Sequence, residues 1–271
     1  MIKLAFNYRI DPLSLLFLRM IFSLPFFIII PLLLRQQKPQ ESPKTSDYLK
    51  LVLLGILGYY ASSMLDFIGL QYVTAGLERL ILFIYPTIVA LLMFVIFKKS
   101  IGIKGIMALV LTYAGIMVVF LNGHLTQQPG IYKGALFIFA SACTYAIYLV
   151  GSSRLIPKFG SVRFTAYVMI VSCASVIVHF LLLQTGSMLS YPMPVYALSV
   201  AIALISTVFP TFMISEGIKI IGAGKAAIIG SVGPVATIVL GYIFLHEPIT
   251  INEIIGTGLV LTGVLLVSAN K

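Results

Sequence analysis

The chain has 271 residues, of which 60% are hydrophobic and 10% are charged, and it carries a formal net charge of +10. Soluble domains are typically about 45–50% apolar and about 25% charged, so this composition excludes a water-soluble globule of this length. The Lys and Arg residues stand in short loops between apolar runs rather than along one face or in a tail, which excludes a nucleic-acid-binding protein.

Apolar runs of about 20 residues recur along the chain, and each is long enough to cross a bilayer core about 30 Å thick as a helix. We therefore predict an all-α membrane protein, a polytopic helical bundle of nine spans. In chain order, the expected spans are residues 12–34, 48–72, 75–97, 101–121, 130–150, 163–183, 194–218, 223–244 and 251–269. Short connections such as "KKS" (98–100) and "HEPIT" (246–250) make consecutive helices antiparallel.

The hydrophilic loop "RQQKPQESPKTSD" (35–47) sets the expected orientation. If this loop is cytoplasmic, most basic residues fall on the cytoplasmic side, as the positive-inside rule requires: Arg35, Lys38, Lys44, Lys50, Lys98, Lys99, Lys104, Arg154, Lys158, Arg163, Lys219, Lys225 and Lys271. The outer side then carries Lys3, Arg9, Arg79 and Lys133. We expect an integral protein of a bacterial inner membrane with a cytoplasmic C-terminus.

The chain contains an internal repeat. Residues 75–119 align without a gap to residues 223–267, a shift of 148 positions, and the Ala-Gly pair at 75–76, Pro86 and Gly115 recur in register. The expected span 75–97 and its copy 223–244 are separated by an odd number of crossings, so they would cross the membrane in opposite directions. Inverted repeats of this kind are typical of secondary transporters. We predict a first repeat at 1–121 with four spans and a second at 130–271 with five.

The same shift leaves the first repeat one helix short, because a second repeat that starts near 130 maps to a position before residue 1. We therefore expect a ten-helix inverted-repeat fold that lacks its first helix. A sequence that starts late is the simpler interpretation, and a genuine nine-span form is the alternative.

The segment "AGKAAIIGSVGPVATIVLGYIFLHEPITINEIIGTGLVLTGVLLV" (223–267) resembles the EamA-like branch of the drug/metabolite transporter superfamily, through Pro234, the Glu247-Pro248 turn and the glycines that follow. Residues 11–23, 75–92 and 141–150 are similar to the family's second helix, its fourth helix and the start of its second repeat. The resemblance covers nearly the whole chain. It implies a ten-helix transporter with a central substrate pathway between its repeats, acting as an exporter. Lys99 stands where the second repeat has Glu247, which departs from a paired-glutamate pattern.

Two features predict a substrate pathway. Pro86 and Pro234 occupy matching positions, and paired interrupted helices point to a transporter binding site. Hydroxyl-bearing residues also recur four positions apart, on one helix face. Packing kinks and ordinary hydroxyl packing are the alternatives. The candidate pathway residues are Tyr59, Ser63, Tyr85, Pro86, Tyr145, Tyr148, Thr207, Thr211, Ser231 and Pro234.

Four charged residues from three consecutive spans are expected at one level near the outer side: Arg19, Asp66, Glu78 and Arg79. Charges at membrane depth usually face a bundle interior or an aqueous cavity, so we predict an outer gate or a contact to a charged group of the substrate. In this hypothesis Asp66 pairs with Arg19 or Arg79. The alternative is an interfacial ion-pair cluster whose arginines extend to the headgroups.

Catalytic and metal chemistry find no support in the sequence, since the three His residues are scattered and no "GxxxxGK[ST]" segment is present. We expect no enzyme, no catalytic residue, no metal and no cofactor. The predicted function is secondary active transport of small metabolites or drug-like molecules across the inner membrane by alternating access, with export favoured. A non-transporting membrane scaffold or sensor is the alternative. The expected partners are a small-molecule substrate and the lipid bilayer, with a homodimer allowed and no nucleic acid.

Overall fold

A computed structural model describes residues 1–34, 42–98, 103–120, 129–183, 191–229, 242–244 and 250–268, and every regular element in these ranges is helical. Six helices in the described part are long and apolar enough to cross a membrane: Pro12–Leu33, Thr45–Gly69, Ala75–Ile96, Ile131–Phe159, Ser161–Leu183 and Met193–Ala227. The chain is therefore an integral membrane protein of the helical type. The count of nine spans stays a prediction, because much of the expected span 223–244 lies outside the described residues.

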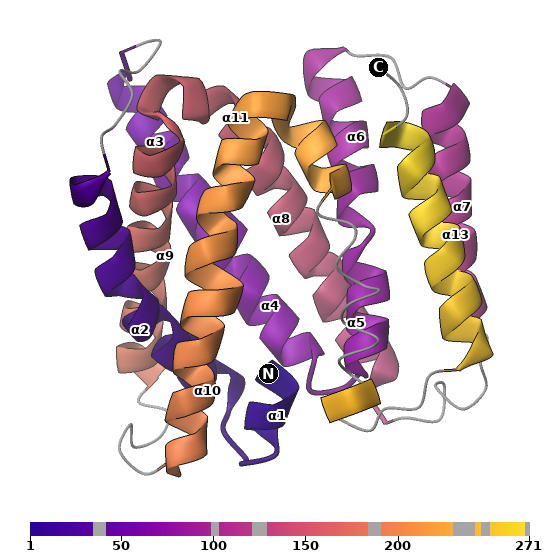
Figure 1. Cartoon of the computed structure of the whole chain (residues 1–271), viewed down its shortest axis with the longest axis horizontal. Coiled ribbons are helices and arrows are strands. Elements are labelled where there is room, and N and C mark those ends of the chain that lie inside the picture. The colour runs from indigo at the N-terminus through magenta and orange to yellow at the C-terminus, as the bar shows by residue number, and fades with distance from the viewer. Residues whose placement is uncertain are drawn as a thin grey trace.

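Consecutive crossings of the chain run antiparallel, and some of them consist of two helices in succession (Figure 1). Their bounds are α1 Ile2–Phe6, α2 Pro12–Leu33, α3 Thr45–Gly55, α4 Ser62–Gly69, α5 Ala75–Leu82, α6 Tyr85–Phe97, α7 Ile103–Phe120, α8 Ile131–Phe159, α9 Ser161–Leu183, α10 Met193–Ala203, α11 Phe209–Ile229 and α13 Ile251–Ser268. Two π-helical segments, η1 Ile56–Ala61 and η2 Leu204–Val208, join α3 to α4 and α10 to α11.

Local sequence signals account for several helix ends. The Asp11 side chain accepts the backbone N–H of Ser14 at 2.9 Å, and Pro12 takes the first position of α2, where its missing N–H costs nothing. Thr74 caps α5 in the same way, through the backbone N–H of Leu77 at 3.2 Å. These caps place the starts of α2 and α5 where the apolar pattern predicts them.

The expected span 130–150 is too short. Helix α8 continues to Phe159 and ends only at Gly160, whose φ of 77° is left-handed and readily available to glycine. Hydropathy marks the apolar part of a helix, whereas the polar last turns of α8 extend beyond that part. Helix α9 then begins at Ser161, two residues before its expected start.

The expected span 75–97 is interrupted where the proline predicts it. Helix α5 ends at Leu82 and α6 begins at Tyr85, so a turn at residues 83–84 separates them. Pro86 stands at the start of α6, where it cannot donate a backbone hydrogen bond to the preceding turn. The matching segment around Pro234 lies outside the described residues.

The π-helical segments were not expected from the sequence, and they fall at matching positions. Moving η1 by the repeat shift of 148 positions brings residues 56–61 onto residues 204–209, and η2 is Leu204–Val208. The same shift brings α7, residues 103–120, onto α13, residues 251–268. Helices that correspond in sequence thus share their irregularities and their bounds.

Helix α8 lies in the middle of the bundle and packs against α3, α4, α5, α6, α9 and α11 (Figure 1). Helices α2 and α9 pack side by side toward one end of the molecule, and α7 packs along α13 at the other. The start of α3 and the ends of α6 and α8 share the upper edge in Figure 1.

Candidate functional site

A cavity of about 290 Å³ lies between η1 and α4 on one side and α10 to α11 on the other, and residues of α1, α2, α5, α6 and α8 complete its wall. Binding sites for small molecules typically have volumes of about 300–1,000 Å³, so this cavity is at the small end of that range. Its lining residues are Ile2, Arg19, Gly58, Tyr59, Ser62, Ser63, Asp66, Phe67, Arg79, Leu82, Phe83, Tyr85, Ser141, Tyr145, Ile202, Ser206, Pro210, Thr211 and Ile214.

Tyrosines form one wall of the cavity. The ring of Tyr145 lies 5.3 Å from that of Tyr85 and 6.4 Å from that of Tyr59, edge to face in both cases. Tyr148, one helical turn from Tyr145, stacks against it at 5.9 Å and meets Tyr59 at 4.9 Å. The hydroxyl of Tyr85 donates to the carbonyl of Ala227 at 2.9 Å and ties α6 to α11. The wall is therefore apolar on its ring faces and carries hydroxyls at its edges.

Close packing holds η1 against α8 at this wall. A Cβ at Gly58 would lie 2.4 Å from the ring of Tyr148, so only glycine allows this approach. In the part of the chain that the structure describes, the buried hydroxyls of Tyr59 and Tyr148 have no hydrogen-bond partner. Leaving such a group unpaired costs about 1–3 kcal/mol.

Arg19 is 8% exposed and lies inside the bundle. Its Nε donates to Oγ1 of Thr207 at 2.7 Å, and its guanidinium lies 5.5 Å from the centre of the Phe67 ring. Thr207 in turn donates to the carbonyl of Ile202 at 3.0 Å. A buried guanidinium requires such partners because desolvation of its charge is costly. The Arg19 side chain therefore finds its partners inside the bundle.

An ion pair within this cluster joins consecutive residues of α5, because Nε of Arg79 lies 3.3 Å from the Glu78 carboxylate. The pairing of Asp66 with Arg19 or Arg79 stays a prediction. Asp66 lies on α4 with Arg79, Glu78 and Arg19 as its charged neighbours. Its Oδ1 has no hydrogen-bond partner among the described residues. Three of the four charged residues line the cavity: Arg19, Asp66 and Arg79. Their role as a gate or substrate contact stays a prediction.

A serine pair joins α4 to α8. The hydroxyls of Ser62 and Ser141 lie 3.0 Å apart, and Ser141 also donates to the carbonyl of Ser62 at 2.8 Å. Ser206 and Pro210 are further lining residues that the analysis missed. Their signal was the four-residue spacing that Ser62 shares with Asp66 and Ser206 with Pro210, but such spacing is common in packed membrane helices.

The predicted pathway residues have three outcomes. Tyr59, Ser63, Tyr85, Tyr145 and Thr211 line the cavity directly. Tyr148, Pro86 and Thr207 lie behind it, next to a lining residue. Ser231 and Pro234 lie outside the described residues. A role for any of them in substrate binding stays a prediction.

Potential metal ligands do not gather at this site. In residues 1–34, 42–98, 103–120, 129–183 and the other described ranges, no group of three His, Cys, Asp or Glu side chains could hold a metal ion. Cys143 and Cys173 are both free thiols. The cavity offers ring faces, hydroxyls and charges of both signs to a bound molecule.

Comparison with known proteins gives one consistent result. Residues 1–121 and 132–269 match the model of the EamA-like transporter family. The chain is 34% identical to "Uncharacterized transporter YcbK" of Bacillus subtilis (strain 168), over 97% of this chain and 86% of that protein. It is 26% identical to "Uncharacterized transporter YyaM" of the same organism, over 91% of this chain and 82% of that protein.

More distant proteins extend this result. An "Uncharacterized transporter" of Archaeoglobus fulgidus is 26% identical, over 94% of this chain and 86% of that protein. A solved structure named "Crystal structure of protein" has a TM-score of 0.70 at 16% identity, and the match covers 98% of this chain and 91% of that chain. At that identity the likeness concerns the fold alone.

Proposed function

The chain belongs to the EamA-like transporter family of the drug/metabolite transporter superfamily, and from this premise we propose that it is a secondary active transporter of small metabolites or drug-like molecules. The observation that carries the proposal is the cavity within the bundle, because it is lined from both sequence halves and contains buried charges and hydroxyls. Ionisable groups inside a membrane protein are costly and mark substrate or ion pathways.

Alternating access between two inverted repeats is the proposed mechanism. The family match in two parts, at 1–121 and 132–269, supports two related halves. The repeat shift of 148 positions brings η1 onto η2 and α7 onto α13, which also supports two related halves. The chain runs in opposite directions through η1 and η2 (Figure 1), which is the relation that an inverted repeat requires.

The cavity suggests how a substrate would be held and released. Arg19, Arg79 and Asp66 offer charges of both signs to polar groups of a substrate, and the rings of Tyr59 and Tyr145 offer flat apolar faces. Segments η1 and η2 flank the cavity, and π-helical turns are frequent at functional sites. We propose that these two segments and the break before Pro86 are the hinges at which the cavity changes the side to which it opens.

We also propose the location, orientation and direction of transport. The protein would lie in the bacterial inner membrane with the upper edge of Figure 1, and the C-terminus, on the cytoplasmic side. Basic residues at that edge, such as Lys50, Arg154 and Lys158, support this orientation through the positive-inside rule. Export is the proposed direction.

Thiol labelling tests the cavity. Cysteines introduced at Ser63 or Thr211, with Cys143 and Cys173 replaced by alanine, should react with a water-soluble thiol reagent in membrane vesicles, because both positions line the cavity. A cysteine at Ser199 is the matched control, since Ser199 is fully buried and donates to a carbonyl of its own helix. Labelling at the first two positions only, together with substrate efflux, supports a transporter. Protection of all three positions would indicate a scaffold or sensor.

A further inference from the structure

A second cavity lies between α3 and α8, at the edge of the bundle that carries the start of α3 and the end of α8. Its volume is about 550 Å³. The lining divides into two kinds of residue: Lys50, Arg154 and Lys158 are basic, whereas Leu53, Leu57 and Ile147 are among its apolar members. It shares no lining residue with the cavity described above.

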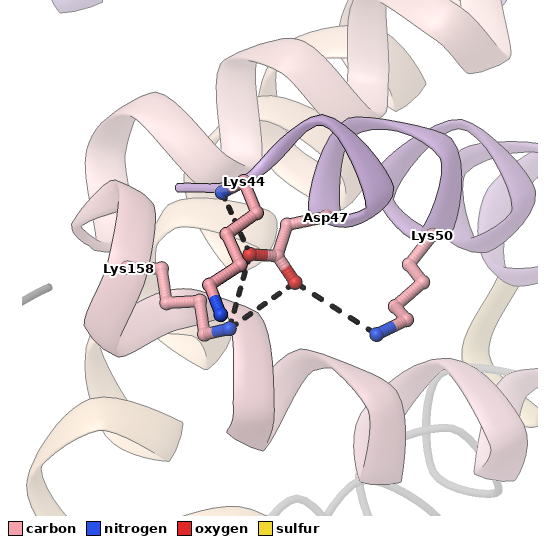
Figure 2. Close-up of polar contacts among 4 residues, drawn as sticks. All are labelled: Lys44, Asp47, Lys50 and Lys158. Carbon is pink, nitrogen blue, oxygen red and sulfur yellow. Dashed lines mark hydrogen bonds and ion pairs between the residues drawn. The ribbon is translucent and has the colours of Figure 1, made fainter. Parts of the chain in front are cut away.

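One buried carboxylate organises the basic end (Figure 2). Asp47 is 2% exposed, accepts the backbone N–H of Lys44 at 2.9 Å and lies 3.0 Å from Nζ of Lys158. Lys50 lies 3.8 Å from the same carboxylate with its side chain 63% exposed. Asp47 thus pairs closely with Lys158. The exposed ammonium of Lys50 lies farther from this carboxylate and adds positive charge at the outer part of the same end.

The apolar end opens toward the outside of the bundle. Leu53 is 50% exposed and Ile147 is 42% exposed, although both lie within membrane-spanning helices. Side chains so exposed at this depth face the acyl chains of the bilayer, where burying apolar surface is favourable.

On both helices the basic residues lie nearer the edge of the bundle and the apolar residues lie farther from it. On α3 and η1, Leu57 follows Lys50 by seven positions, and on α8, Ile147 precedes Arg154 by seven positions. Seven residues of helix rise about 10 Å. Because α3 begins and α8 ends at the same edge in Figure 1, both basic ends are at the membrane surface and both apolar ends are deeper.

We propose that this groove binds an anionic phospholipid of the surrounding leaflet. Its headgroup phosphate lies between Lys50 and the Lys158–Arg154 turn, and one acyl chain runs over Leu53, Leu57 and Ile147. A phospholipid requires a basic site for its headgroup at the membrane surface and an apolar surface for its acyl chain deeper in the membrane. The groove has both in this order. A soluble phosphate would use the rim and leave the apolar part unoccupied. The bound lipid bridges α3 and α8 next to η1 and therefore stabilises their contact.

The test uses the full chain in a neutral detergent, with three probes: dioleoylphosphatidylglycerol, dioleoylphosphatidylcholine and glycerol 1-phosphate. We expect native mass spectrometry to show retention of the phosphatidylglycerol in preference to the phosphatidylcholine, and the anionic lipid to raise the melting temperature more. Lys50→Gln should weaken phosphatidylglycerol binding about fivefold, the effect of one lysine near a membrane surface. Ile147→Trp, which fills the apolar part without a change of charge, should weaken it as well.

Arg163→Gln is the matched control, because Arg163 is an exposed basic residue at the same edge, on α9, and lies outside the groove. It should leave lipid retention unchanged. Equal retention of the two lipids would overturn the proposal, as would equal losses in Arg163→Gln and Lys50→Gln. Stabilisation by glycerol 1-phosphate as large as that by the lipid would also overturn it, since the site would then bind a soluble anion.

Discussion

Nε of Arg19 on α2 donates a hydrogen bond of 2.7 Å to Oγ1 of Thr207 on η2, although 188 positions separate the two residues. This contact joins the proposed first half of the chain to η2, which we propose as a hinge of the second half. It also supplies a partner to a guanidinium that the membrane would otherwise leave poorly solvated.

Breaking this contact from one side should be costly. Thr207→Val keeps the shape of the side chain and removes the acceptor, so the buried Arg19 loses a partner and stability should fall by about 1–3 kcal/mol. The double variant Arg19→Met/Thr207→Val should be less destabilised than the two single effects added together, because it leaves no unpaired charge. Thermal unfolding of the four purified proteins measures this coupling. Strict additivity would show that the hydrogen bond does not contribute.

Removal of the helix interruption should separate stability from transport. Pro86→Ala restores a backbone N–H at the start of α6 and favours a continuous helix from Ala75 to Phe97. Stability should hold or rise, while transport should fall because the wall near Tyr85 loses its shape or its hinge. Pro25→Ala, which changes a proline within α2 that does not line the cavity, is the control and should leave transport unchanged. Normal transport by Pro86→Ala would show that this proline contributes to helix packing and not to transport.

Two tyrosine substitutions should have opposite effects on stability. Tyr85→Phe removes a hydroxyl that donates to the Ala227 carbonyl, at a cost of about 1 kcal/mol. Tyr148→Phe removes a buried hydroxyl that has no hydrogen-bond partner in the described part of the chain, so stability should be unchanged or slightly higher. The melting temperatures of both proteins test this ranking. A clear loss in Tyr148→Phe would mean that its hydroxyl pairs with water or with the neighbouring hydroxyl of Tyr59, Ser152 or Ser215.

The contact between η1 and α8 should tolerate no side chain at residue 58. Gly58→Ala places a Cβ 2.4 Å from the Tyr148 ring, and overpacking of this kind typically costs about 1–3 kcal/mol. Gly217→Ala is the control, because the nearest atom to its Cβ would be that of Ala226 at 4.0 Å. If the clash is the cause, Tyr148→Leu should restore part of the stability lost in Gly58→Ala. Equal melting temperatures for the two alanine variants would contradict this account.

Features that depend on neighbours along the chain could be predicted from the sequence by itself. Apolar runs bounded by caps such as Asp11 and Thr74 located helices, because the bilayer demands about 20 apolar residues per span and helix ends need local partners. The proline at 86 predicted the interruption that separates α5 from α6, since its missing N–H acts within one turn. The rarity of charges in apolar runs singled out Arg19 and Asp66.

Features that depend on contacts between distant helices were decided only by the tertiary structure. The hydroxyl of Thr207 looks like any other in a membrane helix until packing brings Arg19 against it, and Ser62 finds Ser141 in the same way. The hydropathy profile does not reveal the π-helical turns of η1 and η2 either, because it averages over several turns of a helix. The spacing of residues along the sequence indicates which side chains share a helix face. Which side chains from different helices contact one another is decided by how the helices pack.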